Sequence, residues 1–502
     1  MSDPLLLQKN NTLSIRALLR DEPERITEML RSSAHWRLDV SRTPVRLDEW
    51  RGFFGDSGND ELRRAVSELF SGAIVNASEN QPALHMALRA ERPGQMLGDP
   101  DAAVVTASRR RMLEVSGGLY RGDTGIRTIL HAGIGGSDLG PRLVADALDP
   151  GDSAVNVEWL ATLDARRIGR LLNRLDPATT GLVVASKSFS TSETLSQAAL
   201  IRDWLGPAGA ERSWAATANV ERAREFGIPE SNILPFPTWT GGRFSLWSSV
   251  GLSAAARIGP DQWQRVLAGA EQADRLLAGD LEASPAYGLA RVLDRLVRGA
   301  GFDTLGVVSY DPALRLLAEY LQQLVMESLG KSVDLHGAPI QGHTSPLVFG
   351  GAGTDLQHSL FQALHQGTKR HPMLLLGSAR CSEGPTTWPR DQLSHLLGQA
   401  SALVNGKSAD DRSRELPGNN PVMLMLARSI HAESVGDLLA NFEHAVYLLG
   451  ALWRINAFDQ WGVEEGKRLA AEFRSVLDGA GDCPDRSLDR TIEWIRRFLD
   501  GE

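Results

Sequence analysis

The sequence predicts an α/β protein with two doubly wound parallel-sheet domains and helical N- and C-terminal extensions. Short apolar runs alternate with amphipathic segments from about residue 101 onward. This alternation is interrupted by two helical runs and then resumes. Apolar runs separated by helices are typical of buried parallel strands, because helices then cover both faces of the sheet. Two alternations therefore indicate two sheets.

The first alternation supplies the elements of the first sheet and the helices that cover it. We expect strands over residues 128–132, 155–161, 182–185, 214–218 and 233–236, and helices over residues 139–148, 166–175, 194–205 and 221–226. Helical runs at 262–277 and 287–298 then lead to the second alternation.

The second alternation is expected to form strands over 304–309, 373–376 and 422–426, and helices over 312–328, 356–366 and 390–403. Residues before 101 look helical and irregular, and the end is helical over 435–453 and 464–477. We accordingly divide the chain into a helical extension, a first α/β domain, a second α/β domain and a helical C-terminal region, which span residues 1–100, 101–285, 286–430 and 431–502.

Composition restricts the class of partner. The chain has 53 basic and 62 acidic residues and no basic tract, which argues against nucleic-acid binding. Two cysteines form neither a disulfide framework nor a zinc cluster. Residues 1–26 resemble neither a signal peptide nor a membrane span, and no later stretch approaches 18 apolar residues. We expect a cytoplasmic protein without a membrane partner.

Residues 181–194 are the most informative stretch. An apolar strand ends at a polar turn that contains Ser186, Lys187, Ser188, Ser190 and Thr191, and a helix follows. Unpaired N–H groups and the positive end of the helix dipole favour a phosphate at such a turn, and Lys187 adds a mobile charge. An ordinary helix N-cap with additional serines is an equal alternative on these residues alone.

The glycine-rich segment 133–141 follows the first strand directly. Glycines there let the backbone approach a ligand closely. A dinucleotide fold would use G-x-G-x-x-G at this place, but the spacing of Gly133, Gly135, Gly136 and Gly140 does not fit that pattern. Glu158 nevertheless lies near the position of the ribose acid, so a nucleotide, a sugar phosphate and a plain tight turn all stay open.

Two further segments each carry one residue whose side chain could take part in a reaction. Arg243 follows two glycines and precedes a helix, where a cation could stabilise an oxyanion. Glu327 follows Leu324, Val325 and Met326, and partial desolvation there would suit a general base. In isolation, a surface arginine and a solvated helix-end glutamate are the more ordinary interpretations.

The last two segments carry a histidine and a lysine. His358 lies in a glycine-rich approach near an expected helix N-terminus, and His365 lies on nearly the same helical face, so either histidine could simply be packed. Lys467 is placed at the beginning of the last expected helix. Each residue alone is a weak indication.

Taken together, these segments resemble the glucose-6-phosphate isomerase family. The matching motifs, in order, are GIGGSDLGP, SKSFSTSET, GGRFSLWS, QQLVMESLGK, GTDLQHSLFQALHQGTK and FDQWGVEEGK, which span residues 133–467. The resemblance implies two sugar-isomerase (SIS-type) domains with helical extensions. It also implies a homodimer that uses no metal and no cofactor.

The resemblance implies a role for each matching residue. Ser186, Lys187, Ser188 and Thr191 would hold the phosphate, and Gly136 and Ser137 would contact the sugar. Glu327 would shuttle a proton between C2 and C1, and Arg243 would stabilise the enediolate, with Gln323 and Gln460 nearby. His358, supplied by the partner subunit, and Lys467 would assist ring opening. Aldose–ketose isomerisation needs such a base, such a cation and a separate acid/base group.

Some positions depart from the family pattern. Ser188 and Ser190 stand where threonine is usual, Leu329 stands where asparagine is usual, and the segment 79–82 is less basic. None of these positions holds a proposed catalytic atom, but they leave substrate preference open, including the use of mannose 6-phosphate. The main alternatives are a non-catalytic sugar-phosphate-binding regulator of the same fold and a nucleotide-dependent enzyme that uses the Gly133 segment.

Overall fold

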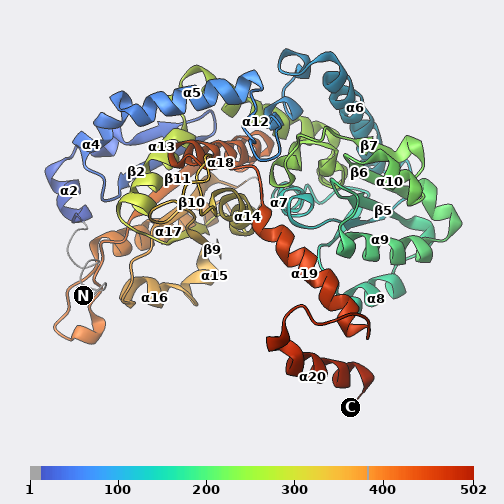
Figure 1. Cartoon of the computed structure of the whole chain (residues 1–502). Coiled ribbons are helices and arrows are strands. Elements are labelled where there is room, and N and C mark those ends of the chain that lie inside the picture. Colours follow the sequence, from blue (N-terminus) through green and yellow to red (C-terminus); the bar gives the residue numbers. More distant parts are fainter. Residues whose placement is uncertain (1–12, 382–383, 502) are drawn as a thin grey trace. The chain divides into compact units, whose positions relative to one another are not determined.

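The computed structural model describes residues 13–381 and 384–501. The chain divides into two compact units, Met1–Ala457 and Phe458–Glu502, which are described separately below (Figure 1). The first unit contains both sheets. The finer division at residues 101, 286 and 431 stays a prediction. Residues 1–12, part of the segment judged above to be no signal peptide, lie outside the described residues.

The first sheet is parallel throughout and confirms the first alternation. Its strand order is β4-β3-β5-β6-β7. The strands are β3 (Thr128–Ala132), β4 (Asn156–Leu160), β5 (Thr180–Ala185), β6 (Ser213–Thr217) and β7 (Ile233–Pro235). The chain order reverses at β3, which lies between β4 and β5. Ligands of open α/β sheets bind beyond the carboxyl ends of the strands at such a reversal.

Four helices connect these strands and lie close to their expected ranges. They are α7 (Leu139–Ala147), α8 (Ala165–Arg174), α9 (Ser192–Leu205) and α10 (Val220–Glu225). Their apolar residues join those of the strands in one buried cluster that includes Leu130, Leu182, Val184, Ile201 and Ala223. Burial of both sheet faces explains why the strands are uninterrupted apolar runs.

The second sheet is mixed, with strand order β1-β2-β11-β10-β8-β9. Its parallel strands are β8 (Thr304–Ser309), β9 (Leu347–Ala352), β10 (Met373–Arg380) and β11 (Val422–Ser429). β2 (Trp36–Arg42) pairs antiparallel with β11, and β1 (Leu30–Ser32) pairs with β2. The expectation that residues 1–100 are helical and irregular was therefore incomplete, and β9 was also missed.

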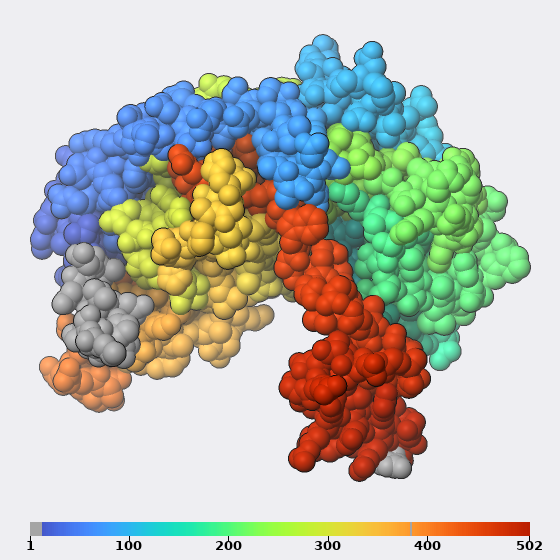
Figure 2. Space-filling model, viewed as in Figure 1, coloured from blue at the N-terminus to red at the C-terminus, as the bar shows by residue number. Residues whose placement is uncertain are grey.

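The N-terminal segment covers the half of the first unit that holds the second sheet. Its helices include α2 (Ile15–Asp21), α4 (Leu47–Gly52) and α5 (Ser57–Ser71), followed by the long α6 (Asp99–Arg121). The blue surface in Figure 2 is this segment, and it extends over several neighbouring elements of the same unit. Trp36, Leu38 and Val40 of β2 are fully buried, which explains why the segment is held firmly against the unit.

Helix α18 (Ala432–Trp453) lies at the centre of the first unit. It is buried along most of its length and packs against α12 (Pro260–Gly279), α13 (Pro285–Asp294) and α14 (Leu317–Leu329). The expected helix over 356–366 is broken into α15 (Gly353–Gln357) and α16 (Phe361–Gln366). Helix α17 (Trp388–Asn405) then covers β10.

As far as residue 501, the second unit contains the α-helices α19 (Trp461–Leu477) and α20 (Asp489–Asp500), with the 3-10 helix Arg486–Leu488 between them. Only the first of these was expected from the sequence. Among residues 13–381 and 384–501, no helix combines the length and the apolar character needed to cross a membrane.

Candidate active site

The turn after β5 has the form expected of an anion site. Helix α9 begins at Ser192, and no side chain caps its N-terminus, although Thr191 stands at the N-cap position. The first N–H groups of this helix are therefore open to an external acceptor. The hydroxyl groups of Ser188 and Ser190 are 2.7 Å apart, and those of Ser186 and Thr191 are 3.4 Å apart.

Residues at and just after the end of strand β6 hold the backbone of this turn by hydrogen bonds. The carbonyl oxygen of Lys187 accepts bonds from the Ala218 N–H at 3.0 Å and the Thr217 hydroxyl at 3.1 Å. Phe189 adopts a left-handed φ of 48° and is buried, which anchors the turn in the core. Burial lowers the pKa of Lys187, while the carboxylate of Glu79 acts in the opposite direction. Lys187 is thus a partly desolvated cation beside an open helix end.

The glycine-rich segment leaves the neighbouring strand β3 at the same edge of the sheet. Its 3-10 turn, Gly135–Ser137, precedes α7, and Gly135 has a φ of 60°. His131 of β3 is fully buried, and its Nε2 lies 2.7 Å from the Ser137 carbonyl oxygen. Its Nδ1 lies 2.7 Å from the Ser253 hydroxyl. Burial lowers the pKa of His131 to about 4, so a neutral ring holds Ser137 in place.

A second turn, Gly242–Trp247, lies directly against the first. A Cβ atom on Gly136 would stand 1.9 Å from the Gly242 carbonyl oxygen, so only glycine permits this approach. The Ser245 hydroxyl donates to that same carbonyl oxygen at 2.6 Å. The contact places the residue after Gly242 next to the expected sugar-binding segment.

That residue is Arg243, and its side chain is buried. Its Nε donates to the Ser328 hydroxyl at 2.6 Å, and its Nη2 donates to the Ala457 carbonyl oxygen at 2.5 Å. Its Nη1 lies 3.3 Å from Oε2 of Glu327. Bonds to two groups besides Glu327 fix the guanidinium, as a preorganised oxyanion donor requires.

Glu327 lies near the end of α14, with 28% of its side chain exposed. Its Oε1 accepts from Nε2 of Gln323 at 3.3 Å, one helical turn earlier. A Cβ atom on Gly135 would lie 2.7 Å from the same Gln323 nitrogen, which shows that Gln323 also reaches the glycine-rich segment. The structure therefore brings together Gly136, Arg243, Gln323 and Glu327.

His358 does not join this group within the first unit. It is the C-cap residue of the short helix α15, lies two residues before the N-cap of α16, and is exposed. Within residues 13–381 and 384–501, the side-chain hydrogen bonds of Glu327 go to Arg243 and Gln323 and none goes to His358. His365 is a packed residue whose Nε2 lies 2.7 Å from Oε1 of Gln399.

Gln460 and Lys467 belong to the second unit. Gln460 stands at the N-cap of α19, and Lys467 lies in that helix with its Nζ 2.9 Å from Oε1 of Glu464. Helix α19 is not the last helix, contrary to expectation, because α20 follows it.

The nucleotide interpretation of the Gly133 segment finds no support in the geometry. Glu158, the candidate ribose acid, makes ion pairs with Arg167 at 3.3 Å and Arg174 at 3.4 Å. Its carboxylate is thus engaged by two cations of α8.

Leu329, which stands where the family usually has asparagine, is fully buried and lines a small apolar cavity. An apolar side chain therefore suits that position.

The sequence analysis did not predict a role for three residues that the structure places near the site. Ser328 and Ala457 hold Arg243, and His131 holds Ser137. Ser328 stands next to Glu327 within a motif, so its polarity in an apolar run was an available signal. A backbone carbonyl such as that of Ala457 leaves no such signal.

Comparison with known proteins identifies similar chains. The family model described as phosphoglucose isomerase matches residues 39–486. The chain is 40% identical over 479 residues to glucose-6-phosphate isomerase of Stenotrophomonas maltophilia (strain R551-3), covering 94% of each protein. It is 39% identical over 485 residues to glucose-6-phosphate isomerase of Xylella fastidiosa (strain 9a5c), covering 95% of each.

A solved structure agrees with the fold. The crystal structure of a glucose-6-phosphate isomerase from Chlamydia trachomatis has a TM-score of 0.85 and 26% sequence identity, and the match covers 99% of both chains. The two-sheet architecture and the helices at both ends are thus shared over nearly the whole length.

Proposed function

The chain belongs to the phosphoglucose isomerase family, and on that premise we propose that it interconverts glucose 6-phosphate and fructose 6-phosphate. The observation that carries the proposal is the pairing of Arg243 with Glu327 at 3.3 Å beside Gly136. A carboxylate and a fixed cation are the two groups that proton transfer next to a carbonyl requires. A non-catalytic regulator would need no such pair.

In this proposal the phosphate is held at the start of α9. Ser186, Lys187, Ser188 and Thr191 supply hydroxyl and ammonium donors, and the open N–H groups of the helix add to them. Gly136 and Ser137 contact the sugar. Binding the far end of the substrate orients its reacting carbons without taking part in the chemistry.

Glu327 removes the proton from C2 of glucose 6-phosphate and returns it to C1. Negative charge then develops on the substrate oxygen, and Arg243 stabilises this enediolate. Gln323 orients the carboxylate of Glu327 through its 3.3 Å bond, and Gln460 supports the same end of the substrate. His358 and Lys467 assist ring opening, which must precede proton transfer.

The test of this chemistry is exchange of solvent hydrogen at C2 in heavy water. Wild-type protein should exchange and isomerise, and Glu327→Gln should do neither. Glu319→Gln is a matched control, because Glu319 lies on the same helix and also pairs with an arginine, Arg142, at 2.8 Å. Full turnover by Glu327→Gln would remove Glu327 as the base.

We also propose a homodimer in which His358 completes the partner's site. The exposed position of His358, outside the group around Glu327, supports this arrangement. Coexpression of Glu327→Gln and His358→Asn chains tests it. In mixed dimers one site would combine intact Glu327 with the partner's intact histidine, so about a quarter of the wild-type rate should return at random assortment. No recovery in a mixed dimer would place His358 in its own subunit's site.

Substrate range and location complete the proposal. A panel of glucose, mannose and glucosamine 6-phosphates would establish whether the enzyme selects the hydroxyl group at C2.

We propose a cytoplasmic location, because doubly charged sugar phosphates do not cross an apolar bilayer unaided. Fractionation of cells with an antibody to the chain would test that location.

A further inference from the structure

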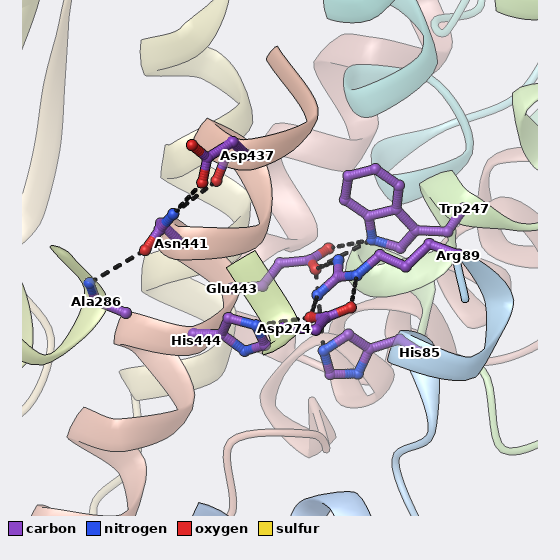
Figure 3. Close-up of polar contacts among 9 residues, drawn as sticks. All are labelled: His85, Arg89, Trp247, Asp274, Ala286, Asp437, Asn441, Glu443 and His444. Carbon is purple, nitrogen blue, oxygen red and sulfur yellow. Dashed lines mark hydrogen bonds and ion pairs between the residues drawn. The ribbon is translucent and has the colours of Figure 1, made fainter. Parts of the chain in front are cut away.

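Figure 3 shows a cluster of buried charged side chains in which Arg89 contacts Asp274 and Glu443. Arg89 follows the 3-10 turn His85–Leu88, and its side chain has no exposed surface. Its Nε and Nη2 donate to Asp274 of α12 at 2.8 and 2.6 Å. Its Nη1 donates to Glu443 of α18 at 2.5 Å. One arginine thus joins two carboxylates from two helices.

The same cluster reaches the turn Gly242–Trp247 at its last residue. The indole N–H of Trp247 donates to both oxygens of Glu443, at 2.8 and 3.0 Å. The guanidinium carbon of Arg89 lies 4.6 Å from the centre of the Trp247 ring. Trp247 is therefore held by a bond from its edge and by a cation over its face.

The same turn is also contacted near its beginning. The ring of His85 lies 4.7 Å from the ring of Phe244, with 31° between the planes. Phe244 directly follows Arg243. The segment 85–89 therefore contacts the turn at two residues that follow Arg243, Phe244 and Trp247.

The protonation of the cluster agrees with a fixed geometry. Burial alone would raise the pKa of Asp274, but Arg89 outweighs it and holds that pKa below its usual range. Burial raises the pKa of Glu443 to about 7, with Arg89 acting in the opposite direction. Burial also raises the pKa of Tyr320 on α14, and the nearby Glu443 carboxylate adds to this. The cluster therefore also adjoins the helix that carries Glu327.

Stability alone does not account for such a cluster. Enclosing charges costs several kcal/mol per ion, and well-packed apolar residues in their place are often as stable. Hydrogen bonds of fixed direction supply something that apolar packing does not, namely a single orientation of the joined elements. The joined elements here are α12, α18 and the turn with Arg243.

We propose that Arg89 is a positioning residue for the isomerisation, acting through Glu443 and Trp247 to fix the turn Gly242–Trp247 and so the guanidinium of Arg243. Arg89 touches no substrate in this arrangement. The inference rests on the proposed function, since it concerns the cation that stabilises the enediolate. A small displacement of such a group is costly, because the transition state is stabilised only in the productive geometry.

The test compares Arg89→Met and Trp247→Phe with wild type. Trp247→Phe removes only the indole donor and keeps an aromatic ring, so it remains informative if Arg89→Met does not fold. We expect kcat to fall about 10- to 100-fold in both variants, with KM changed less than about threefold. Arg25→Met and Trp36→Phe are matched controls, since each removes a buried donor elsewhere, and they should keep kcat.

A second readout separates positioning from a merely structural role. A five-carbon sugar-phosphate hydroxamate carries an anionic oxygen like the enediolate, whereas glucitol 6-phosphate carries only the phosphate and hydroxyls. Both variants should lose hydroxamate affinity by about the same factor as kcat and keep glucitol 6-phosphate affinity. Unchanged kcat and hydroxamate affinity in folded Arg89→Met and Trp247→Phe would overturn the inference. Absence of isomerisation by wild type would instead overturn the proposed function.

Discussion

The backbone of Gly136 lies against the carbonyl group of Gly242, so that the glycine-rich segment and the turn with Arg243 are in direct contact. A Cβ atom on Gly136 would stand 1.9 Å from the Gly242 oxygen and 2.3 Å from its carbon. Both neighbours are backbone atoms, which cannot rotate away as a side chain can. The spacing between the Gly136 segment and the turn that carries Arg243 therefore depends on the absence of one methyl group.

The variant Gly136→Ala tests the contact between Gly136 and Gly242. The methyl group must push the two turns apart, which we expect to lower the free energy of unfolding by about 1–3 kcal/mol and to reduce kcat strongly. Thermal unfolding and initial rates measure the two effects. Gly169→Ala in α8, where a Cβ atom would meet nothing within 4 Å, is the control and should not destabilise the protein. Wild-type kcat in Gly136→Ala would contradict the contact.

Lys187→Met should weaken binding rather than chemistry. The substitution removes the cation at the phosphate turn, and a hydrogen bond to a charged group contributes about 1.5–3 kcal/mol. We therefore expect KM for the sugar phosphate to rise about 10- to 100-fold, with a smaller change in kcat. Inhibition by inorganic phosphate should weaken in parallel. Lys369→Met removes an exposed lysine that pairs with Asp303 and should change neither value; an unchanged KM in Lys187→Met would exclude the phosphate role.

Ser328→Ala tests how firmly Arg243 must be held. The variant removes the 2.6 Å bond to Nε and leaves the bond from Nη2 to Ala457. We expect kcat to fall about tenfold at nearly constant KM, because the loss concerns a charge-assisted bond at the oxyanion cation. Ser309→Ala removes another buried hydroxyl, at the end of β8, and serves as the control. A rise in KM without loss of kcat would assign Ser328 to substrate binding.

His131→Asn should change the pH dependence of stability. The pKa of His131 is about 4 in the folded protein, below the unfolded value of about 6.5, so the unfolded state binds a proton that the folded state excludes between these values. The contribution of His131 is therefore present above pH 6.5 and is lost as the pH falls. The stability advantage of wild type over His131→Asn should shrink by about 3 kcal/mol from pH 7 to pH 4.

Denaturant unfolding at several pH values measures this difference. His395→Asn, at an exposed position on α17, should leave the slope of stability against pH unchanged. A constant difference between wild type and His131→Asn across this range would mean that the pKa of His131 is the same in the folded and unfolded states.

Much of the fold followed from hydrophobic pattern. β3 was predicted with its observed bounds, and the other strands of the first sheet lay within two residues, because strands buried on both faces are unbroken apolar runs. β2 was missed although Trp36, Leu38 and Val40 alternate with polar residues, since its neighbours in sequence are helical. β9 was missed because Gly350 and Gly351 have low strand propensity. The close contact with β8 requires glycine there, since a Cβ atom on Gly350 would lie 1.7 Å from the Val307 oxygen.

The candidate site likewise has features that the sequence could predict and features that depend on the fold. The strand, the turn and the helix start around Lys187 could be predicted because they are adjacent in sequence, and the phosphate role of the turn stays a prediction. The roles of Arg243 and Glu327 were inferred from motif resemblance, and their contact at 3.3 Å came only from the fold. The polarity of Ser328 was a local signal, but no local pattern could predict that its partner would be Arg243, and the carbonyl group of Ala457 leaves no signal at all. His358 was placed by motif, and its exposure depends on how α15 ends.

The pairing of β2 with β11 has a consequence for how the protein is made. β2 leaves the ribosome early, and its partner near Met425 emerges only after both α/β alternations have been synthesised. Until then β2 has an unpaired edge, and Trp36 lacks its buried surroundings and its bond to the Ser434 carbonyl group. Long-range pairing of this kind closes a large loop and is slow. The second sheet is therefore completed after translation of most of the chain, and the apolar side chains of β2 lack their native partners until then.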